Sequence, residues 1–203
     1  MRLQKIDDLT RPDHYHLRVD DEVYFLRERP SGDYKAGETN QLIANLKIKP
    51  TVRTSNPKRY RYKARAIAQC AQELAAAINL DDLRGVTLVP IPPSEAPEPG
   101  YDDRLLQVLR GIPALDVREL VMQRESIRAA HASAGNRPSV DDLYANYFVV
   151  EALCNPEPTT IVIFDDVLTA GSHYRAMQRR LSERFPRASI AAVFIARQKR
   201  NPA

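Results

Sequence analysis

The spacing of apolar residues along the chain predicts one long helix. Between positions 57 and 80 the apolar residues fall three or four positions apart and form a single stripe, which is the pattern of an amphipathic helix. The stripe consists of Ala64, Ile67, Ala68, Ala71, Leu74, Ala75 and Ile78. Pro57 suits the first turn of such a helix. We therefore predict a helix over residues 57–80.

Short continuous apolar runs predict strands that are buried on both faces. Such runs lie at residues 86–93, 161–164 and 189–197. Strands of this kind that alternate with helices indicate an α/β fold with a mostly parallel sheet flanked by helices. Parallel sheets bind ligands at the carboxyl ends of their strands. We expect the strand ends at Pro90 and Asp165 to open onto the same edge of the sheet.

The N-terminal segment, residues 1–50, is predicted to be a small β-rich, hood-like unit before an α/β domain at residues 51–203. In `HLRVDDEVYFL`, Val23 and Phe25 alternate with their neighbours and two aspartates fall at a turn, which predicts a hairpin. `TNQLIANLKIK` is expected to form a short helix capped by Thr39.

The middle of the chain has a less regular pattern. Leucine spacing predicts a helix at 103–110, and `ALDVRELVM` and `LYANYFVV` are each expected to form a strand. Residues 124–142 carry few apolar side chains and contain Gly135 and Pro138. We expect a long polar loop there, of the kind that often closes over a ligand.

Composition sets broad limits on the class of protein. The 203 residues, of which 43% are hydrophobic and 28% charged, suit one globular α/β domain, with or without a small appendage. No apolar run approaches the roughly 20 residues that span a bilayer. The first residues lack the apolar core of a signal peptide, so we expect a cytoplasmic protein without membrane contact. The net charge of +4 is compatible with a polyanionic ligand.

Cysteine and histidine usage predicts no metal centre. Cys70 and Cys154 belong to no C-x-x-C pair, so neither a disulfide framework nor a zinc site is expected. His14 and His16 in `DHYH` have no third ligand nearby in sequence and are expected at the surface.

The stretch `TTIVIFDDVLTAGSHYRAMQRRL`, residues 159–181, carries the most specific chemistry. Its apolar run leads directly into two adjacent carboxylates, Asp165 and Asp166. Two neighbouring anions at the end of a buried strand cost repulsion and desolvation. Such carboxylates can accept hydrogen bonds from the hydroxyl groups of a sugar.

The loop after these acids suits a phosphate group. Thr169, Gly171 and Ser172 offer hydroxyl donors and a flexible backbone before a helix that begins near His173. Free N–H groups at a helix N-terminus favour a phosphate dianion. A ribose 5-phosphate could thus be held by donors at one end and by acceptors at the other. The alternative is an exposed acidic turn that joins a strand to a helix.

The segment `IVIFDDVLTAGS` resembles the motif of type I phosphoribosyltransferases: an apolar strand, two acids, two apolar residues, then Thr-x-Gly-Thr/Ser. `VTLVPIPPS` is similar to the first strand and pyrophosphate loop of that fold, in the form found in ComF-type and amidophosphoribosyltransferase-like members. `NLKIKP` with the following helix, and `AGNRPSVDDLYANYF` with Arg137, are similar to further ComF-type segments. The resemblance covers roughly residues 42–197, and only residues 165–172 match a highly specific motif.

The resemblance implies a phosphoribosyltransferase-like fold that binds 5-phosphoribosyl-1-pyrophosphate (PRPP) with Mg²⁺, or another ribose 5-phosphate-containing nucleotide. Such enzymes transfer the phosphoribosyl group to a nitrogen nucleophile, such as a nucleobase or ammonia, and release pyrophosphate. By this resemblance, Asp165 and Asp166 would hold the ribose hydroxyls and, through these or through water, Mg²⁺.

The resemblance also assigns the remaining substrate contacts. The 5-phosphate would be held by Val167, Leu168, Thr169, Ala170, Gly171 and Ser172, and the pyrophosphate by Ile91, Pro92, Pro93 and Ser94. Candidates for closing over the pyrophosphate lie on the polar loop, namely Arg124, Arg128, His131 and Arg137, of which Arg137 is expected to act in catalysis. The alternative for these four is a solvated loop.

Two other functions remain open. ComF-type proteins often carry a four-cysteine zinc finger and a basic run after the first strand, whereas this chain has no such cysteines and the acidic run `SEAPEPGYDDRLL`. The acidic run favours a regulatory protein that binds PRPP or a nucleotide without turnover. In `KPTVRTSNPKRYRYKARA`, basic residues are interleaved with tyrosines, a pattern that suits single-stranded nucleic acid. The chain could therefore be a nucleic-acid-associated accessory protein, with a solvated helix face as the simpler interpretation of Lys58, Arg59, Arg61, Lys63 and Arg65.

Overall fold

The computed structural model describes residues 2–95, 100–113, 115–126 and 138–200. The strands are β1 (Gln4–Lys5), β2 (Glu22–Arg29), β3 (Val86–Pro90), β4 (Asp116–Val117), β5 (Val121–Gln123), β6 (Tyr147–Val149), β7 (Thr160–Leu168) and β8 (Ser189–Gln198). The α-helices are α1 (Glu38–Leu46), α2 (Val52–Ser55), α3 (Pro57–Ala77), α4 (Arg104–Arg110), α5 (Val140–Asn146) and α6 (Ser172–Arg184). Short 3₁₀ helices are η1 (Arg11–Asp13), η2 (Tyr34–Ala36), η3 (Leu80–Leu83) and η4 (Glu151–Leu153).

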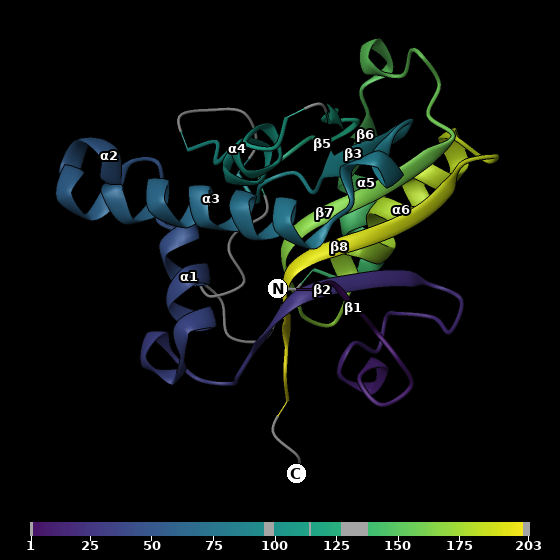
Figure 1. Ribbon diagram of the computed structural model, residues 1–203. Helices are drawn as coiled ribbons and strands as arrows, with labels where there is room; N and C mark the ends of the chain where they lie inside the picture. Colours follow the sequence, from purple (N-terminus) through teal and green to yellow (C-terminus); the bar gives the residue numbers. More distant parts are fainter. Residues whose placement is uncertain (1, 96–99, 114, 127–137, 201–203) are drawn as a thin grey trace.

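The main sheet has six strands in the order β1-β2-β8-β7-β3-β4 (Figure 1). Strands β2, β8, β7, β3 and β4 run parallel to one another, and β1 pairs with β2 in the antiparallel sense. Strands β5 and β6 form a separate antiparallel pair. The predicted α/β class with a mostly parallel sheet is confirmed.

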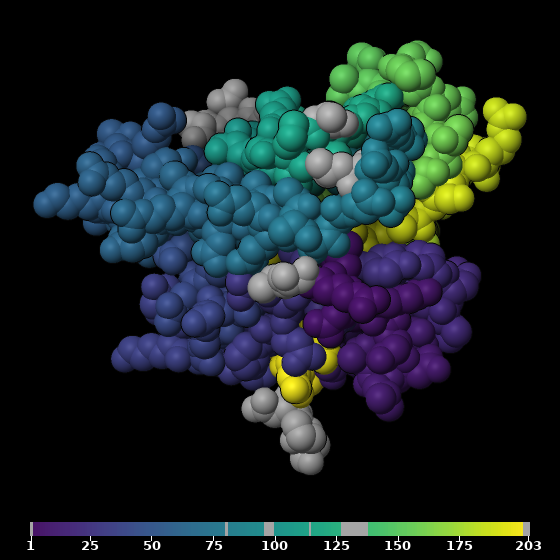
Figure 2. Space-filling model, in the orientation of Figure 1, coloured from purple at the N-terminus to yellow at the C-terminus, as the bar shows by residue number. Residues whose placement is uncertain are grey.

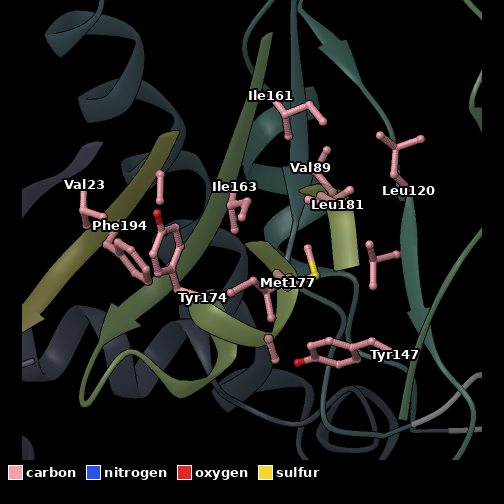
Figure 3. Close-up of a cluster of buried hydrophobic side chains, with 14 of the residues drawn as sticks. Val23, Val89, Leu120, Tyr147, Ile161, Ile163, Tyr174, Met177, Leu181 and Phe194 are labelled. Atoms are coloured by element: carbon pink, nitrogen blue, oxygen red, sulfur yellow. The ribbon is translucent and has the colours of Figure 1, made fainter. Parts of the chain in front are cut away.

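An apolar core covers each face of the main sheet. One core packs β7 and β8 against α6 through Ile163, Met177 and Phe194, as Figure 3 shows. The other lies under α1, α3 and α4 and contains Leu74 and Phe164. Consecutive residues of β7 serve opposite cores because strand side chains alternate between the two faces. Within the described residues, no helix is long and apolar enough to cross a bilayer.

The connections between strands change direction between β3 and β7. The chain leaves β3, passes through α4 and reaches β4 on one side, whereas it leaves β7, passes through α6 and reaches β8 on the other. A reversal of this kind opens a crevice at the carboxyl ends of the two strands, where open α/β sheets bind their ligands. The chain remains bonded to β7 just after β3 ends, because the Ile91 N–H donates a 2.9 Å hydrogen bond to the Phe164 carbonyl within β7. The carboxyl ends of β3 and β7 point to the same edge, as expected, but β7 ends at Leu168 rather than at Asp165.

The hairpin predicted in the N-terminal segment is wrong. Strand β2 begins only at Glu22, and it pairs with β8 and β1 rather than with the residues just before it. Asp21, expected at the turn, is buried and forms an ion pair with Arg175 of α6. A carboxylate that has a buried cationic partner has no reason to occupy an exposed turn.

Several helix and strand predictions need correction in detail. Helix α1 is confirmed, but its cap is Gly37, and Thr39 is buried inside the helix. The stretch `ALDVRELVM` contributes to two strands, β4 and β5, which belong to different sheets. The first half of `LYANYFVV` continues α5, and only residues 147–149 form a strand.

The helix predicted from the strongest periodic pattern is confirmed as α3, but its buried face is rotated from the predicted one. Lys63, Ala66 and Cys70 are buried, whereas Ala64 and Ala68 are exposed. Alanine leaves little apolar area to bury, so the alanines of the stripe did not fix which side of the helix faces the sheet.

Candidate functional site

The two adjacent carboxylates lie within β7, which continues to Leu168, rather than after its end. Because successive strand residues point to opposite faces, they enter different surroundings. Asp165 lies on the α6 side and lines a cavity with Ser172 and His173. Asp166 lies on the opposite side, where it bonds Lys47 and Arg104.

Asp165 borders a small cavity beside the predicted phosphate loop. The cavity has a volume of about 20 Å³, and its lining includes Asp165, Thr169, Gly171, Ser172 and His173. That volume suits a single water molecule. The loop residues that the sequence predicts to bind phosphate therefore do meet one of the predicted acids, around a space much smaller than a sugar phosphate.

Burial, with the neighbouring Asp166 carboxylate, raises the pKa of Asp165 to about 7. One oxygen of Asp165 accepts a 2.7 Å hydrogen bond from the Asp166 backbone N–H. This carboxyl group is therefore protonated more readily than an ordinary aspartate, and in its neutral form it can donate as well as accept a hydrogen bond.

His173 is held neutral beside the same cavity. Burial, assisted by the positive charge of Lys47, lowers the pKa of His173 to about 4. Its Nδ1 lies 2.7 Å from the hydroxyl oxygen of Tyr147, a fully buried side chain labelled in Figure 3. Burial also raises the pKa of Tyr147. The neutral imidazole thus accepts or donates one hydrogen bond at Nδ1, and its orientation is fixed by Tyr147.

Asp166 has both carboxylate oxygens bonded to cations. Lys47, just after α1, lies 2.8 Å from Oδ1, and Arg104 of α4 donates bonds of 2.7 and 3.0 Å to Oδ2. Although burial alone would raise it, the pKa of Asp166 is held well below its ordinary value by Lys47 and Arg104. Asp166 is therefore ionised and anchors two cations at the switch between β3 and β7.

The network of ion pairs continues from Arg104 into the protein interior. Asp102 accepts a 3.0 Å bond from Arg104 and a 2.7 Å bond from Lys63, whose side chain is only 1% exposed. The Lys63 ammonium also donates 2.8 Å bonds to the carbonyls of Leu46 and Ile48. Asp102 of the acidic loop is thus a structural partner of two cations.

The loop that the sequence predicts to bind phosphate has a backbone suited to that role. Gly171 caps α6 with φ +90°, a left-handed conformation that favours glycine. Helix α6 then begins at Ser172, so its first N–H groups face the loop without intrahelical partners. Thr169 is exposed at the tip. The loop therefore presents backbone donors, hydroxyls and the positive end of a helix dipole.

The N-terminal segment supports this loop from behind. The fully buried His14 ring bonds the Thr169 carbonyl through Nδ1, and the His16 N–H donates a 3.0 Å bond to the Ala170 carbonyl. Arg175 of α6 donates bonds of 2.8 and 3.0 Å to the His16 carbonyl. The prediction of two surface histidines is wrong for His14, which fixes the position of the loop.

The loop after β3 offers few donors to a pyrophosphate. Pro92 and Pro93 have no N–H group, and the Ile91 N–H is already bonded to Phe164, which leaves the exposed Ser94. Cations approach the loop from another part of the chain, since Lys49 lies 3.3 Å from Glu95.

The polar loop lies mostly outside the described residues. Arg128, His131 and Arg137 belong to the part of the chain, 127–137, that the structure does not describe. Arg124 is described, and it does not line the cavity of Asp165. Its guanidinium lies 5.4 Å from the Phe148 ring, at a separate open cavity of about 380 Å³ that also involves Arg180 and Glu151.

The carboxylates do not fit a resident metal ion. Both oxygens of Asp166 are taken by cations, and burial disfavours the charged form of Asp165. Among the residues that the structure describes, no group of three or more His, Cys, Asp or Glu side chains could hold a metal.

No protein-family model matches the chain, and no curated protein matches it either.

The sequence interpretation missed the roles of Lys47, Arg104 and His14, which bond the predicted acids or loop, and of Tyr147, which bonds His173. Lys47 carried a weak signal, because it lies in the `NLKIKP` segment that resembles ComF-type proteins. Tyr147 carried a similar weak signal, because it lies in the ComF-like segment `AGNRPSVDDLYANYF`. His14 and Arg104 gave none, since their partners are 155 and 62 residues away along the chain.

Proposed function

We propose that the chain is a phosphoribosyltransferase-like protein that binds PRPP, with Mg²⁺ as part of the substrate, at the switch between β3 and β7. The observation that carries the proposal is the meeting of Asp165 with Thr169, Ser172 and His173 around one cavity. Donors for a phosphate and an acceptor for sugar hydroxyls thus lie beside each other at the edge where open α/β sheets bind ligands.

The 5-phosphate would bind across the mouth of the cavity, because its volume of about 20 Å³ cannot enclose a sugar phosphate. The hydroxyls of Thr169 and Ser172 and the first N–H groups of α6 would donate to the phosphate oxygens. Asp165 would accept hydrogen bonds from the ribose hydroxyls. His173, which is neutral, would contribute a hydrogen bond rather than a positive charge at this site.

Asp166 takes a different role from Asp165 in this proposal. It holds Lys47 and Arg104 at the switch, and the Lys47 side chain, 46% exposed, can reach a ligand. Lys47 and Lys49 would then supply the positive charge that the loop after β3 lacks. In the transfer, a nitrogen lone pair attacks C1 of the ribose while the C1–O bond breaks. The pyrophosphate oxygen keeps the bonding electrons, so cations there stabilise the developing charge.

A non-catalytic sensor of PRPP or of a nucleotide is the second candidate. It is favoured by the loop after β3, where only Ser94 has an uncommitted backbone donor among residues 91–94. A sensor needs to hold the sugar phosphate but not to stabilise a leaving pyrophosphate.

Calorimetric titration with PRPP and Mg²⁺ tests binding, and pyrophosphate release with a panel of purines, pyrimidines and ammonia tests turnover. Asp165→Asn, alone and with Asp166→Asn, should abolish binding. The matched control is Asp81→Asn with Asp82→Asn, an exposed pair of neighbouring acids. Circular dichroism checks folding. Binding of PRPP by Asp165→Asn with unchanged affinity would contradict the proposed site.

Turnover separates the two candidates. Pyrophosphate release that depends on one nitrogen acceptor supports the transferase. Saturable binding without release for any member of the panel supports the sensor.

A further inference from the structure

Helix α2 and the first half of α3 form an exposed arm, which we define as residues 52–65. Figure 1 shows α2 and the start of α3 extending away from the sheet, and Figure 2 shows the same segment at the tip of the molecule. Helix α2 has no buried residue, and the first buried residue of α3 is Lys63. The outer surface of the arm therefore contributes nothing to either apolar core.

The arm carries a concentration of positive charge without compensating acids. The chain has no Asp or Glu between Glu38 and Glu73. Five cations of the arm are exposed, namely Arg53, Lys58, Arg59, Arg61 and Arg65. None of these five forms an ion pair with a carboxylate of the described residues, whereas most arginines outside the arm do.

Three of the four exposed cations of α3 are arranged along one face with an aromatic ring among them. Lys58, Arg61, Tyr62 and Arg65 follow the spacing i, i+3, i+4 and i+7, so they lie in one stripe on the helix surface. Tyr62 is 51% exposed, and the Arg65 guanidinium lies 5.8 Å from its ring. The stripe is about 10 Å long, or two helical turns.

Helix stability does not account for this placement. The first turn of α3 contains no acidic residue, although the helix dipole favours negative charge there. Asn56 caps the helix by accepting a 3.0 Å bond from the Arg59 N–H. The cations near the start of α3 therefore oppose the dipole, and an anionic partner would offset that cost.

We propose that the arm binds single-stranded nucleic acid, with phosphates at Lys58, Arg61 and Arg65 and a base stacked on Tyr62. Exposed aromatic rings between cations are the recurring means of holding unpaired bases along a phosphate backbone. A duplex keeps its base faces stacked and hidden from Tyr62. A membrane surface fits poorly, because the apolar face of α3 is buried in the protein core and cannot enter a bilayer.

The arm is distinct from the proposed PRPP site. Lys63, on the opposite side of α3 from the stripe, points inward to Asp102, and the stripe contributes no residue to the Asp165 cavity. Substitutions in the stripe should therefore leave PRPP binding unchanged, and failure of one proposal does not imply failure of the other.

The test measures the affinity of the full chain for fluorescein-labelled 12-nucleotide DNA and RNA single strands of mixed sequence, by anisotropy at several salt concentrations. The charge variant combines Lys58→Ala, Arg61→Ala and Arg65→Ala. Its control combines Arg18→Ala, Lys35→Ala and Arg187→Ala, three exposed cations that likewise form no ion pair with described residues. Tyr62→Ala is compared with Tyr34→Ala, since Tyr34 is 50% exposed and lies off the arm.

We expect the charge variant to bind at least 10-fold more weakly and to lower the slope of log affinity against log salt by about 2, at roughly 0.7 for each lost phosphate contact. The control triple should change the slope by less than half of that. Tyr62→Ala should weaken binding about 5-fold or more, as expected for one lost stacked base, and Tyr34→Ala should not.

Three results would overturn the proposal. One is absence of binding by the parent protein at low salt. Another is equal weakening by both triple variants, which would mean that net charge alone attracts the strand. The third is equal affinity for heparin or for anionic vesicles together with no effect of Tyr62→Ala, which would identify a general polyanion surface.

Discussion

The Lys63 ammonium lies 2.7 Å from the Asp102 carboxylate, although only 1% of the Lys63 side chain is exposed. Burial lowers the pKa of Lys63, while the hydrogen bond to Asp102 opposes that change. Three acceptors surround the ammonium, since the Leu46 and Ile48 carbonyls also bond it. Lys63 thereby ties α3 to the end of α1 and to the loop before α4.

Lys63→Met should lower the free energy of unfolding by about 3–5 kcal/mol, because it leaves the Asp102 charge with one partner fewer and two carbonyls unbonded in a buried site. Urea denaturation measures this loss. Lys58→Met is the control: Lys58 is exposed, and its substitution should change stability by less than about 0.5 kcal/mol. A loss below 1 kcal/mol for Lys63→Met would mean that the buried ammonium has no structural role.

The adjacent acids should respond very differently to the same substitution. Asp166→Asn removes the charge shared by Lys47 and Arg104 and should cost about 3–5 kcal/mol of stability at pH 7. Asp165→Asn should not lower stability at pH 7, because burial disfavours the charged form of Asp165 and asparagine carries no charge. Urea denaturation of the two single variants checks the order. Equal losses would contradict the placement of the two side chains on opposite faces of β7.

Part of this site could be predicted from the sequence. The motif at 165–172 identified the loop, the glycine that caps α6 and an acid beside them, because these features depend on residues close together in the chain. The division between Asp165 and Asp166 was missed because the strand was expected to end before them. Strand alternation separates the two side chains once β7 continues to Leu168.

Long-range pairing set the limits of the fold prediction. Strand β2 pairs with β8, some 170 positions later, so nothing local distinguished it from one arm of a hairpin. Lys63 was assigned to a solvated face because a lysine is almost never fully buried unless it is paired. Its partners become visible only when α1 and the loop before α4 are folded against α3.

The pH dependence of stability should separate Asp165 from His173. The pKa of Asp165 is about 7 in the folded protein, above its ordinary 3.8. Its contribution to the free energy of unfolding is therefore fully present below pH 4 and is lost as pH rises to 7. The pKa of His173 is about 4 in the folded protein, below its ordinary 6.5. Its contribution to the free energy of unfolding is therefore fully present above pH 6.5 and is lost as pH falls to 4. Between pH 5 and 6 the two slopes oppose each other.

Removing either group should expose the other slope. Between pH 5 and 6, Asp165→Asn should make the free energy of unfolding rise with pH more steeply than in the parent, by up to about 1.4 kcal/mol per pH unit. His173→Asn should shift the slope by a similar amount in the opposite direction. Urea denaturation at pH 5.0, 5.5 and 6.0 gives these slopes. A slope that neither variant changes would show that both groups titrate at their ordinary pKa values in the folded protein.

Two glycines with left-handed backbones, one in the loop proposed to bind phosphate and one outside it, separate an effect on ligand binding from the effect of backbone strain. Gly171 has φ +90° and Gly85 has φ +77°. An added Cβ at Gly171 would lie 3.2 Å from Leu17 Cδ2, whereas at Gly85 it would meet nothing within 4 Å. Alanine at either position carries the steric cost of a left-handed conformation, about 1–2 kcal/mol. Gly171→Ala also introduces a close contact with Leu17, which belongs to the N-terminal segment that supports the loop.

Both Gly171→Ala and Gly85→Ala should therefore lower the free energy of unfolding by at least about 1 kcal/mol. Only Gly171→Ala should also weaken PRPP binding, by about 10-fold or more, because the N–H groups at the start of α6 must point at the phosphate to bind it. Urea denaturation and calorimetric titration of the two variants provide the comparison. Equal affinities in the two variants would mean that the Thr169–Ser172 loop does not hold the phosphate, since backbone strain alone is common to both positions.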